Sequence, residues 1–196
     1  MSEEYNPLKS IFDLIMAHPR PDGRGNIIAL TSAFKHSGTS YVSRHLALLA
    51  AESYASSGRR AALIDFDINQ QTQAAAFDTP KMIAAYGTLE GPYDATFNQK
   101  PFWQISPGML SGNGERLSGA ANCGFYLLSQ TALAVSKFDW QTIKAGQSVH
   151  VVKSPEYWDA MRTAFGIVFV DCPASEASDF AMSVVSDADV TVIISP

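Results

Sequence analysis

The chain of 196 residues is 46% hydrophobic, so it can bury one substantial core, and we expect a single domain spanning residues 1–196. Its formal net charge of −5 and its lack of basic runs exclude the electrostatic footprint of a nucleic-acid-binding protein. The two cysteines, Cys123 and Cys172, lie far apart and have no histidine at a metal-ligand spacing, which argues against a disulfide framework or a zinc site.

The N-terminal segment is acidic and polar, and it lacks the basic and apolar regions of a secretory signal. No apolar run has the length of a transmembrane helix, so we expect a cytoplasmic protein. A first helix is predicted over about residues 3–17, with Ile11, Phe12, Ile15 and Met16 on one face. That face is expected to pack on the rest of the domain, and contact with a membrane or a partner is the alternative.

Four apolar runs rich in β-branched and aliphatic residues predict buried strands at 26–30, 61–64, 167–170 and 190–194. Helical patterns follow the first run (40–55) and precede the third (155–165), where Ser154 is the expected N-cap and Pro155 the first helical residue. The alternation predicts an α/β fold, with a mostly parallel, doubly wound sheet flanked by helices.

Between residues 78 and 124 the pattern gives way to Gly, Pro, Asn and Ser, which predicts a long irregular excursion on the surface. Two short alternating runs follow, at 125–130 and 133–140, and predict either a hairpin or two neighbouring strands of the main sheet. Core and hairpin packing is expected of five aromatic residues, with a partner-binding patch as the alternative: Phe102, Trp103, Phe138, Trp140 and Trp158.

The segment 30–51, LTSAFKHSGTSYVSRHLALLAA, runs from a predicted strand through a polar turn into a predicted helix, as phosphate-binding loops do. Such loops follow G-x-x-x-x-G-K-S/T, in which backbone N–H groups hold phosphate, the lysine reaches the outer phosphates and the hydroxyl binds Mg²⁺. Gly38 and Ser40 match this pattern, whereas Ala33 replaces the first glycine and Thr39 replaces the lysine. The predicted nucleotide-binding residues are Lys35, His36, Ser37, Gly38, Thr39 and Ser40.

Two of the predicted strands end in aspartates. Asp65 and Asp67 close the run RRAALIDFD, and Asp171 closes FGIVFVD. Ligands bind at the carboxyl edge of open α/β sheets, so these side chains are expected to share one edge, where their repulsion favours a cation. The predicted Mg²⁺ ligands are Ser40, Asp65 and Asp171, and simple capping or turn formation is the alternative for each aspartate.

Taken in order, the phosphate loop, LIDFD, VFVDCPA and SDADVTVIISP resemble the motifs of the bacterial tyrosine kinases of capsule and exopolysaccharide biosynthesis, in the ParA/MinD-like group of P-loop ATPases. The resemblance spans nearly the whole chain and implies a P-loop NTPase fold. The opening EEYNPLKSIF is similar to the family's E-x-x-R-x-x-R helix, which packs subunits into a ring, and so implies a homo-oligomer. Glu3 matches its acid, while Asn6 and Lys9 stand at the arginine positions. The other matching positions are Thr31, Ser32, Gly38, Ser40, residues 63–67, Asp171 and Pro173.

Departures from the family imply weakened chemistry. Besides Thr39, Lys35 and His36 replace the Pro-Gly of the loop, and Asn69 stands where the family has arginine. Tyr157 is the last tyrosine, so the tyrosine-rich tail that such kinases phosphorylate is not among these residues. A lost charge-assisted hydrogen bond costs about 1.5–3 kcal/mol, or roughly ten- to a hundredfold in ATP affinity. A lost transition-state donor costs about 10²–10³ in rate.

The resemblance therefore implies a degenerate, catalytically impaired kinase-like protein that acts as a regulatory or scaffolding partner in exopolysaccharide biosynthesis. Its partner would be a membrane-bound polysaccharide export or co-polymerase protein, which would hold it at the inner membrane, and no nucleic acid is expected. The cofactor would be weakly bound ATP or ADP with Mg²⁺, or none. The alternative is an active ParA/MinD-like or kinase-like ATPase in which Lys35 or Arg44 substitutes for the lysine, with Asp65, Asp67 and Asp171 as catalytic residues.

Overall fold

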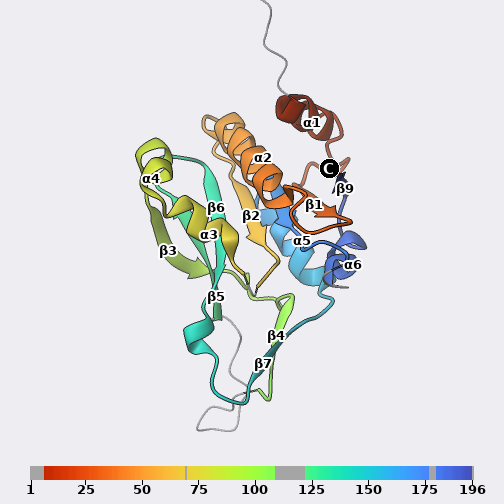
Figure 1. Ribbon diagram of the computed structural model, residues 1–196. Coiled ribbons are helices and arrows are strands. Elements are labelled where there is room, and N and C mark those ends of the chain that lie inside the picture. The colour runs from red at the N-terminus through yellow and green to blue at the C-terminus, as the bar shows by residue number, and fades with distance from the viewer. Residues whose placement is uncertain (1–6, 69, 109–121, 177–179, 196) are drawn as a thin grey trace, which may run out of the picture.

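A seven-stranded sheet forms the central layer of the computed structural model, which describes residues 7–68, 70–108, 122–176 and 180–195 (Figure 1). The strands of this sheet are β1 (Asn26–Ser32), β2 (Ala61–Asp65), β3 (Leu89–Asp94), β5 (Cys123–Leu128), β6 (Leu133–Phe138), β8 (Ile167–Asp171) and β9 (Val190–Ile194). Their order is β3-β5-β6-β2-β8-β1-β9. The helices are α1 (Pro7–Met16), α2 (Thr39–Tyr54), α3 (Thr72–Phe77), α4 (Pro80–Tyr86), α5 (Pro155–Ala164) and α6 (Phe180–Val185), with a 3₁₀ turn at Trp140–Thr142.

The five strands from β6 to β9 in this order run parallel, while β5 is antiparallel to β6 and β3 is antiparallel to β5. The register aligns Leu30 of β1 and Asp65 of β2 with Asp171 of β8, which lies between them. The carboxyl ends of these three strands therefore meet at one edge. The prediction of an α/β fold with a mostly parallel sheet is confirmed, and this topology is compatible with a P-loop-like fold.

Alternating side chains of β1 face two separate apolar cores. Ile28 and Leu30 are buried with Leu46 of α2, and α1 packs on α2 outside them. Ile27 is buried on the opposite face with Trp158 of α5. Figure 1 shows α2 in front of the sheet and α5 and α6 behind it. A strand that is apolar at consecutive positions needs cover on both faces, which is why the helices divide between the two sides.

Helix α1 packs on the domain through Phe12 and Ile15, which are both buried in the core on the α2 side. This confirms the packing expected for its apolar face, although Leu14 on the other side is exposed. The predicted start at about residue 3 lies outside the described residues. Within the described part of the chain, none of the helices combines the length and the apolar character needed to cross a bilayer.

Ser154 stands at the predicted N-cap of α5, but its hydroxyl donates to the carbonyl of Lys100 and makes no cap hydrogen bond. Its backbone carbonyl instead accepts from the N–H groups of Tyr157 and Trp158, so the helix begins there as predicted, with Pro155 in the first turn. The difference arises because the buried hydroxyl finds a partner in a segment 54 residues away, which local sequence does not reveal.

The range 78–124 was expected to be irregular, and the structure corrects this expectation. It contains α4, β3 and a further strand, β4 (Trp103–Ser106), while residues 109–121 lie outside the described part. Strand β4 pairs with β7 (Ser148–Val151) in a separate two-stranded ribbon below the main sheet in Figure 1. These short strands are stabilised by pairing with distant segments, so the local sequence pattern does not predict them.

The runs after this range meet both predicted arrangements, because β5 and β6 form an antiparallel hairpin and are also neighbouring strands of the main sheet. The core role expected of the aromatic residues is confirmed for most of them. Phe102, for example, stacks on Trp158 with ring centroids 5.6 Å apart. Trp140 is the partial exception, because 39% of it is exposed, although its indole N–H donates to the Ile68 carbonyl at 2.7 Å.

Candidate functional site

Residues 33–38 form the loop between β1 and α2, and we call them loop 33–38. Gly38 stands at the N-cap of α2 in the left-handed region (φ 88°), and no side-chain cap accepts from the first turn of the helix. An added Cβ at Gly38 would meet nothing within 4 Å, so the turn requires glycine for its backbone angle. The open helix start has unsatisfied N–H groups and a positive dipole end, which suit an anion.

Two serine hydroxyls hold the shape of loop 33–38. Ser32 and Ser37 both donate to the carbonyl of Phe34, each at 2.8 Å. The side chains of Lys35 and His36 are exposed, and His36 adopts a left-handed backbone angle (φ 61°). The predicted loop residues are therefore placed around the start of α2, but Ser37 uses its hydroxyl within the loop.

The segment that follows β8 runs beside this loop. The N–H of Ser175 donates to the Ser32 carbonyl at 2.9 Å, and the N–H of Glu176 donates to the Ala33 carbonyl at 3.3 Å. This pairing brings the carboxylate of Glu176 onto the loop itself, where it accepts from the backbone N–H of Lys35 at 2.7 Å. A carboxylate of the chain thus occupies one N–H donor of the predicted phosphate loop.

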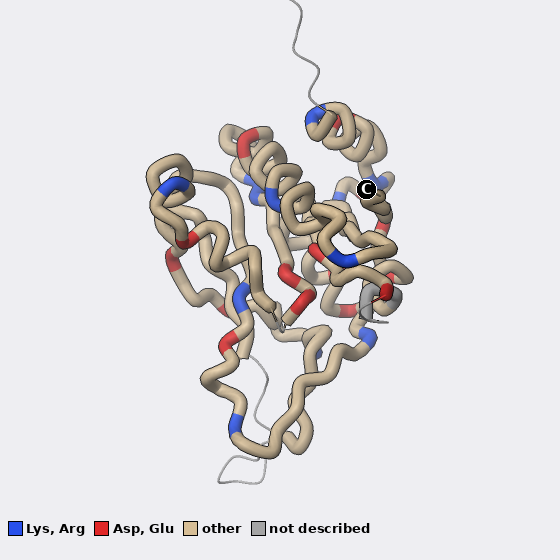
Figure 2. Tube along the Cα trace, viewed as in Figure 1, with Lys and Arg blue, Asp and Glu red and all other residues tan. Residues whose placement is uncertain are grey.

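Asp65 and Asp171 lie side by side at the carboxyl edge of the sheet, because β2 and β8 are adjacent and aligned there. Both are 4% exposed. Acidic residues mark the end of β2 below the start of α2 in Figure 2. Parallel strands are about 4.8 Å apart, so two ionised carboxylates at this spacing repel each other unless donors compensate.

Gln73 of α3 supplies those donors and is itself fully buried. Its side-chain amide donates to Oδ2 of Asp171 at 2.6 Å and to the Ser40 carbonyl at 2.9 Å. Its backbone N–H donates to Oδ2 of Asp65 at 2.9 Å. The guanidinium of Arg44 in turn donates to Oε1 of Gln73 at 3.0 Å. One glutamine therefore links both aspartates to the first turns of α2.

The carboxyl group of Asp65 is buried away from water, and this changes its pKa. Burial raises the pKa of Asp65 to about 7, the nearby charges of Asp171 and Asp67 add to this, and the backbone hydrogen bond from Gln73 opposes it. Its Oδ1 atom is buried without a hydrogen-bond partner. Burying such an oxygen without a partner costs free energy of folding, so the ionised Asp65 carboxylate destabilises the folded state.

Asp171 has more internal partners than Asp65. Burial raises its pKa, but hydrogen bonds from Gln73, Ser40 and Ser43 and the charge of Arg44 act in the opposite direction. The Ser43 hydroxyl lies 3.2 Å from Oδ1 of Asp171. Burial lowers the pKa of the Arg44 guanidinium, against the attraction of Asp171 and Asp65. Arg44 thus lies near the acidic pair but makes its hydrogen bond to Gln73.

The structure brings the predicted Mg²⁺ ligands Ser40, Asp65 and Asp171 together, but this arrangement does not fit the ion. Mg²⁺ needs oxygen ligands in near-octahedral geometry, whereas Oδ2 of Asp171 faces the amide donor of Gln73 at 2.6 Å, and the positive charge of Arg44 already acts on the same carboxylate. Among the described residues, no group of three His, Cys, Asp or Glu side chains is placed to hold a metal ion.

Asp67 lies just beyond the end of β2, and its charge is near enough to add to the raised pKa of Asp65. Strand β2 ends at Asp65, and the half-exposed Asp67 accepts from the backbone N–H of Gln70 through its carboxylate, at 3.3 Å, and through its carbonyl, at 3.1 Å. The alternation that would align the two side chains stops with the strand, so the turn-forming alternative describes Asp67.

The sequence analysis did not predict three residues that contact the aspartates or loop 33–38: Ser43, Gln73 and Glu176. Ser43 lies one helical turn after Thr39, on the face toward the sheet, so helical periodicity carries a weak signal for it. Gln73 and Glu176 have no such signal, because each reaches the site only when its segment folds back onto the carboxyl edge.

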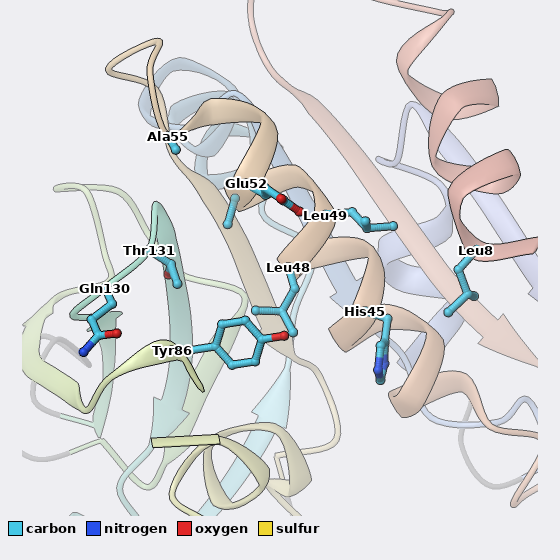
Figure 3. Close-up of a pocket in the computed structure, with 10 residues that line it drawn as sticks. Leu8, His45, Leu48, Leu49, Glu52, Ala55, Tyr86, Gln130 and Thr131 are labelled. Carbon is cyan, nitrogen blue, oxygen red and sulfur yellow. The ribbon is translucent and has the colours of Figure 1, made fainter. Parts of the chain in front are cut away.

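A groove of about 490 Å³ lies along α2, away from these residues. Figure 3 shows Tyr86 of α4 pointing toward Leu48 of α2, with Gln130 and Thr131 of the β5–β6 turn beyond it. No residue of loop 33–38 is among the described residues that line the groove. Five of its ten described lining residues are Leu or Ala and none is Lys or Arg, so the groove has no cation to neutralise a phosphate group.

Comparison with known proteins adds no family to this picture. No protein-family model matches the chain, and no curated protein matches it either. The resemblance to the tyrosine kinases therefore stays a prediction from the motifs.

Proposed function

We propose that this chain is a P-loop-like protein that binds the phosphates of ATP or ADP weakly and does not turn the nucleotide over efficiently. The observation that carries the proposal is the glycine-started helix α2 above the buried pair Asp65–Asp171. In this arrangement loop 33–38 and the start of α2 supply N–H donors for phosphate oxygens. The finer assignment, to the ParA/MinD-like P-loop fold, is part of the same proposal.

Impaired turnover follows from the absence of a lysine at position 39. Thr39 stands at the lysine position and is 9% exposed, so it offers a short hydroxyl in place of a long ammonium. Arg44 does not replace it here, since its guanidinium is engaged with Gln73 beside the acidic pair. Binding survives such a loss better than catalysis does, because charge on the transferred phosphoryl group is greatest in the transition state.

The resemblance extends the proposal to a biological role. As a binding protein related to the exopolysaccharide tyrosine kinases, the chain would regulate or scaffold a membrane-bound polysaccharide export or co-polymerase protein at the inner membrane. This part is supported by the motifs alone. Co-expression with such a co-polymerase from the same organism tests it, with retention on the tagged membrane protein in detergent as the expected result.

Calorimetric titration with ATP and ADP, with and without Mg²⁺, tests the nucleotide proposal. We expect saturable binding, together with no Mg²⁺-dependent ATP hydrolysis above the level of an Asp171→Asn variant. Hydrolysis that disappears in Asp171→Asn would instead favour the active ATPase. In that case Lys35→Met identifies the substitute lysine, because the exposed Lys35 side chain is the remaining cation of loop 33–38.

A further inference from the structure

The two halves of the candidate site are both filled by side chains of the chain itself. The carboxylate of Glu176 lies on the loop, 2.7 Å from the Lys35 nitrogen. The amide of Gln73 lies on the acidic pair, 2.6 Å from Oδ2 of Asp171. The Glu176 carboxylate is an anion that accepts from an N–H group suited to phosphate. The Gln73 amide is a donor that binds a carboxylate suited to a cation.

We infer that this is a self-occupied site, in which Glu176 competes with the phosphate ligand and Gln73 takes the place of the metal ion. The inference rests on the proposed function, since it assumes that loop 33–38 is a phosphate site. Nucleotide must displace Glu176 to bind fully, and binding is independent of divalent cations as long as Gln73 stays in place.

The geometry around Glu176 supports displacement. Its backbone N–H donates to the Ala33 carbonyl, and the N–H of the preceding residue, Ser175, donates to the Ser32 carbonyl. These two hydrogen bonds keep the backbone beside the loop. The Glu176 residue is exposed, so its carboxylate can turn away into water without opening the core. An exposed carboxylate held by one N–H group is a weak internal ligand, which a polyphosphate with several oxygens can replace.

The geometry around Gln73 opposes displacement. Its side chain is fully buried and bonds to Asp171, to the Ser40 carbonyl and to Arg44. Together with Arg44 it compensates the charge that a metal ion would otherwise neutralise. One acceptor is left over, the buried Oδ1 of Asp65, which has no hydrogen-bond partner. This unpartnered oxygen is the position at which a cation would find a ligand if Gln73 were removed.

The Glu176 arm of the test compares ATP affinity without metal in the wild type and in Glu176→Ala. We expect a gain of about fivefold or more, because the fraction of sites open to phosphate rises. Glu90→Ala is the matched control, since Glu90 is also exposed but lies on β3 at the far end of the sheet. It changes the net charge equally and should alter ATP affinity less than about twofold.

The metal arm uses Mn²⁺ as the probe, with ATP affinity measured in Mn²⁺ and in chelator. Wild type is expected to differ less than about twofold between the two, and Gln73→Ala to bind more tightly in Mn²⁺. If Gln73→Ala does not fold, the Glu176 arm decides alone. Equal ATP affinity in wild type and Glu176→Ala overturns the inference and leaves the proposed function intact. Absence of ATP binding in every variant overturns both.

Discussion

The amide of Gln73 donates to the buried carboxylate of Asp171 at 2.6 Å, and the guanidinium of Arg44 donates to the same glutamine at 3.0 Å. A neutral side chain thus stands between an acid and a base in the interior. This relay connects α3 to β8 and α2, so the short helix α3 is held by the polar site as well as by its apolar contacts.

Gln73→Met is expected to destabilise the protein by about 2–4 kcal/mol. Methionine has a similar length but does not replace these hydrogen bonds, so the buried Asp171 carboxylate loses its amide donor and the partly buried Arg44 guanidinium loses its acceptor. Urea denaturation followed by circular dichroism measures the loss. Gln70→Met is the control, because Gln70 is exposed, and it should change the free energy of unfolding by about 0.5 kcal/mol or less. If the two variants changed the free energy of unfolding equally, the hydrogen bonds of Gln73 to Asp171 and Arg44 would not stabilise the fold.

Asp65→Asn is expected to stabilise the protein at pH 8 and to have little effect at pH 4. The pKa of Asp65 is raised from 3.8 to about 7, so the folded state binds the proton more tightly than the unfolded state does. Stability therefore falls as the pH rises through this window, by on the order of 4 kcal/mol for a shift of about three units. Asp171 contributes with the same sign, so part of the decline should persist in the variant.

The measurement is the free energy of unfolding from urea titrations at pH 4, 6 and 8. We expect the gain at pH 8 to be about 2–4 kcal/mol, since asparagine keeps an acceptor for the Gln73 N–H. Asp78→Asn is the matched control, because Asp78 is exposed at the C-cap of α3 and its charge is not among those that shift the pKa of Asp65. A pH profile of Asp65→Asn that parallels the wild type would show that Asp65 is not the titrating group.

Gly38→Ala is expected to cost about 1 kcal/mol of stability and to weaken ATP binding. Gly38 has a φ of 88°, which alanine adopts only with strain, and the turn places the first N–H groups of α2. Gly58→Ala is the control, since Gly58 also has a positive φ (72°) with nothing near its Cβ position. It precedes β2, at the opposite edge of the sheet. Both variants should lose similar stability, and only Gly38→Ala should change the ATP titration.

Asp189→Asn is expected to destabilise the fold by about 2–4 kcal/mol. The Asp189 carboxylate accepts from Arg162 at 3.0 Å, from the backbone N–H of Ile27 at 2.8 Å and also from Arg20. Breaking this largely buried ion pair leaves the Arg162 guanidinium, 10% exposed, with the exposed carboxylate of Asp159 as its remaining charge partner among the described residues. Thermal unfolding against Asp13→Asn tests this. The Lys9–Asp13 pair is well exposed and should be worth about 0.5 kcal/mol or less.

The layered architecture could be predicted from local patterns in the sequence. Apolar runs such as residues 26–30 and 167–170 announce strands that need cover on both faces, because periodicity and hydrophobicity are properties of neighbouring residues. The same local information placed Gly38 at a turn before a helix, and Asp65 and Asp171 at strand ends. Strands β3 and β4 could not be predicted in this way, since each is stabilised by pairing with a segment far along the chain.

The surroundings of the two aspartates and of loop 33–38 depend on how distant segments pack together. Gln73 and Asp171 are 98 residues apart and meet because β2 and β8 are neighbours and α3 folds back over their ends. Glu176 reaches Lys35 because the segment after β8 pairs with the start of loop 33–38. Hydrogen bonds between distant residues depend on strand order and register, which no short stretch of sequence encodes, and these contacts set the charge balance of the site.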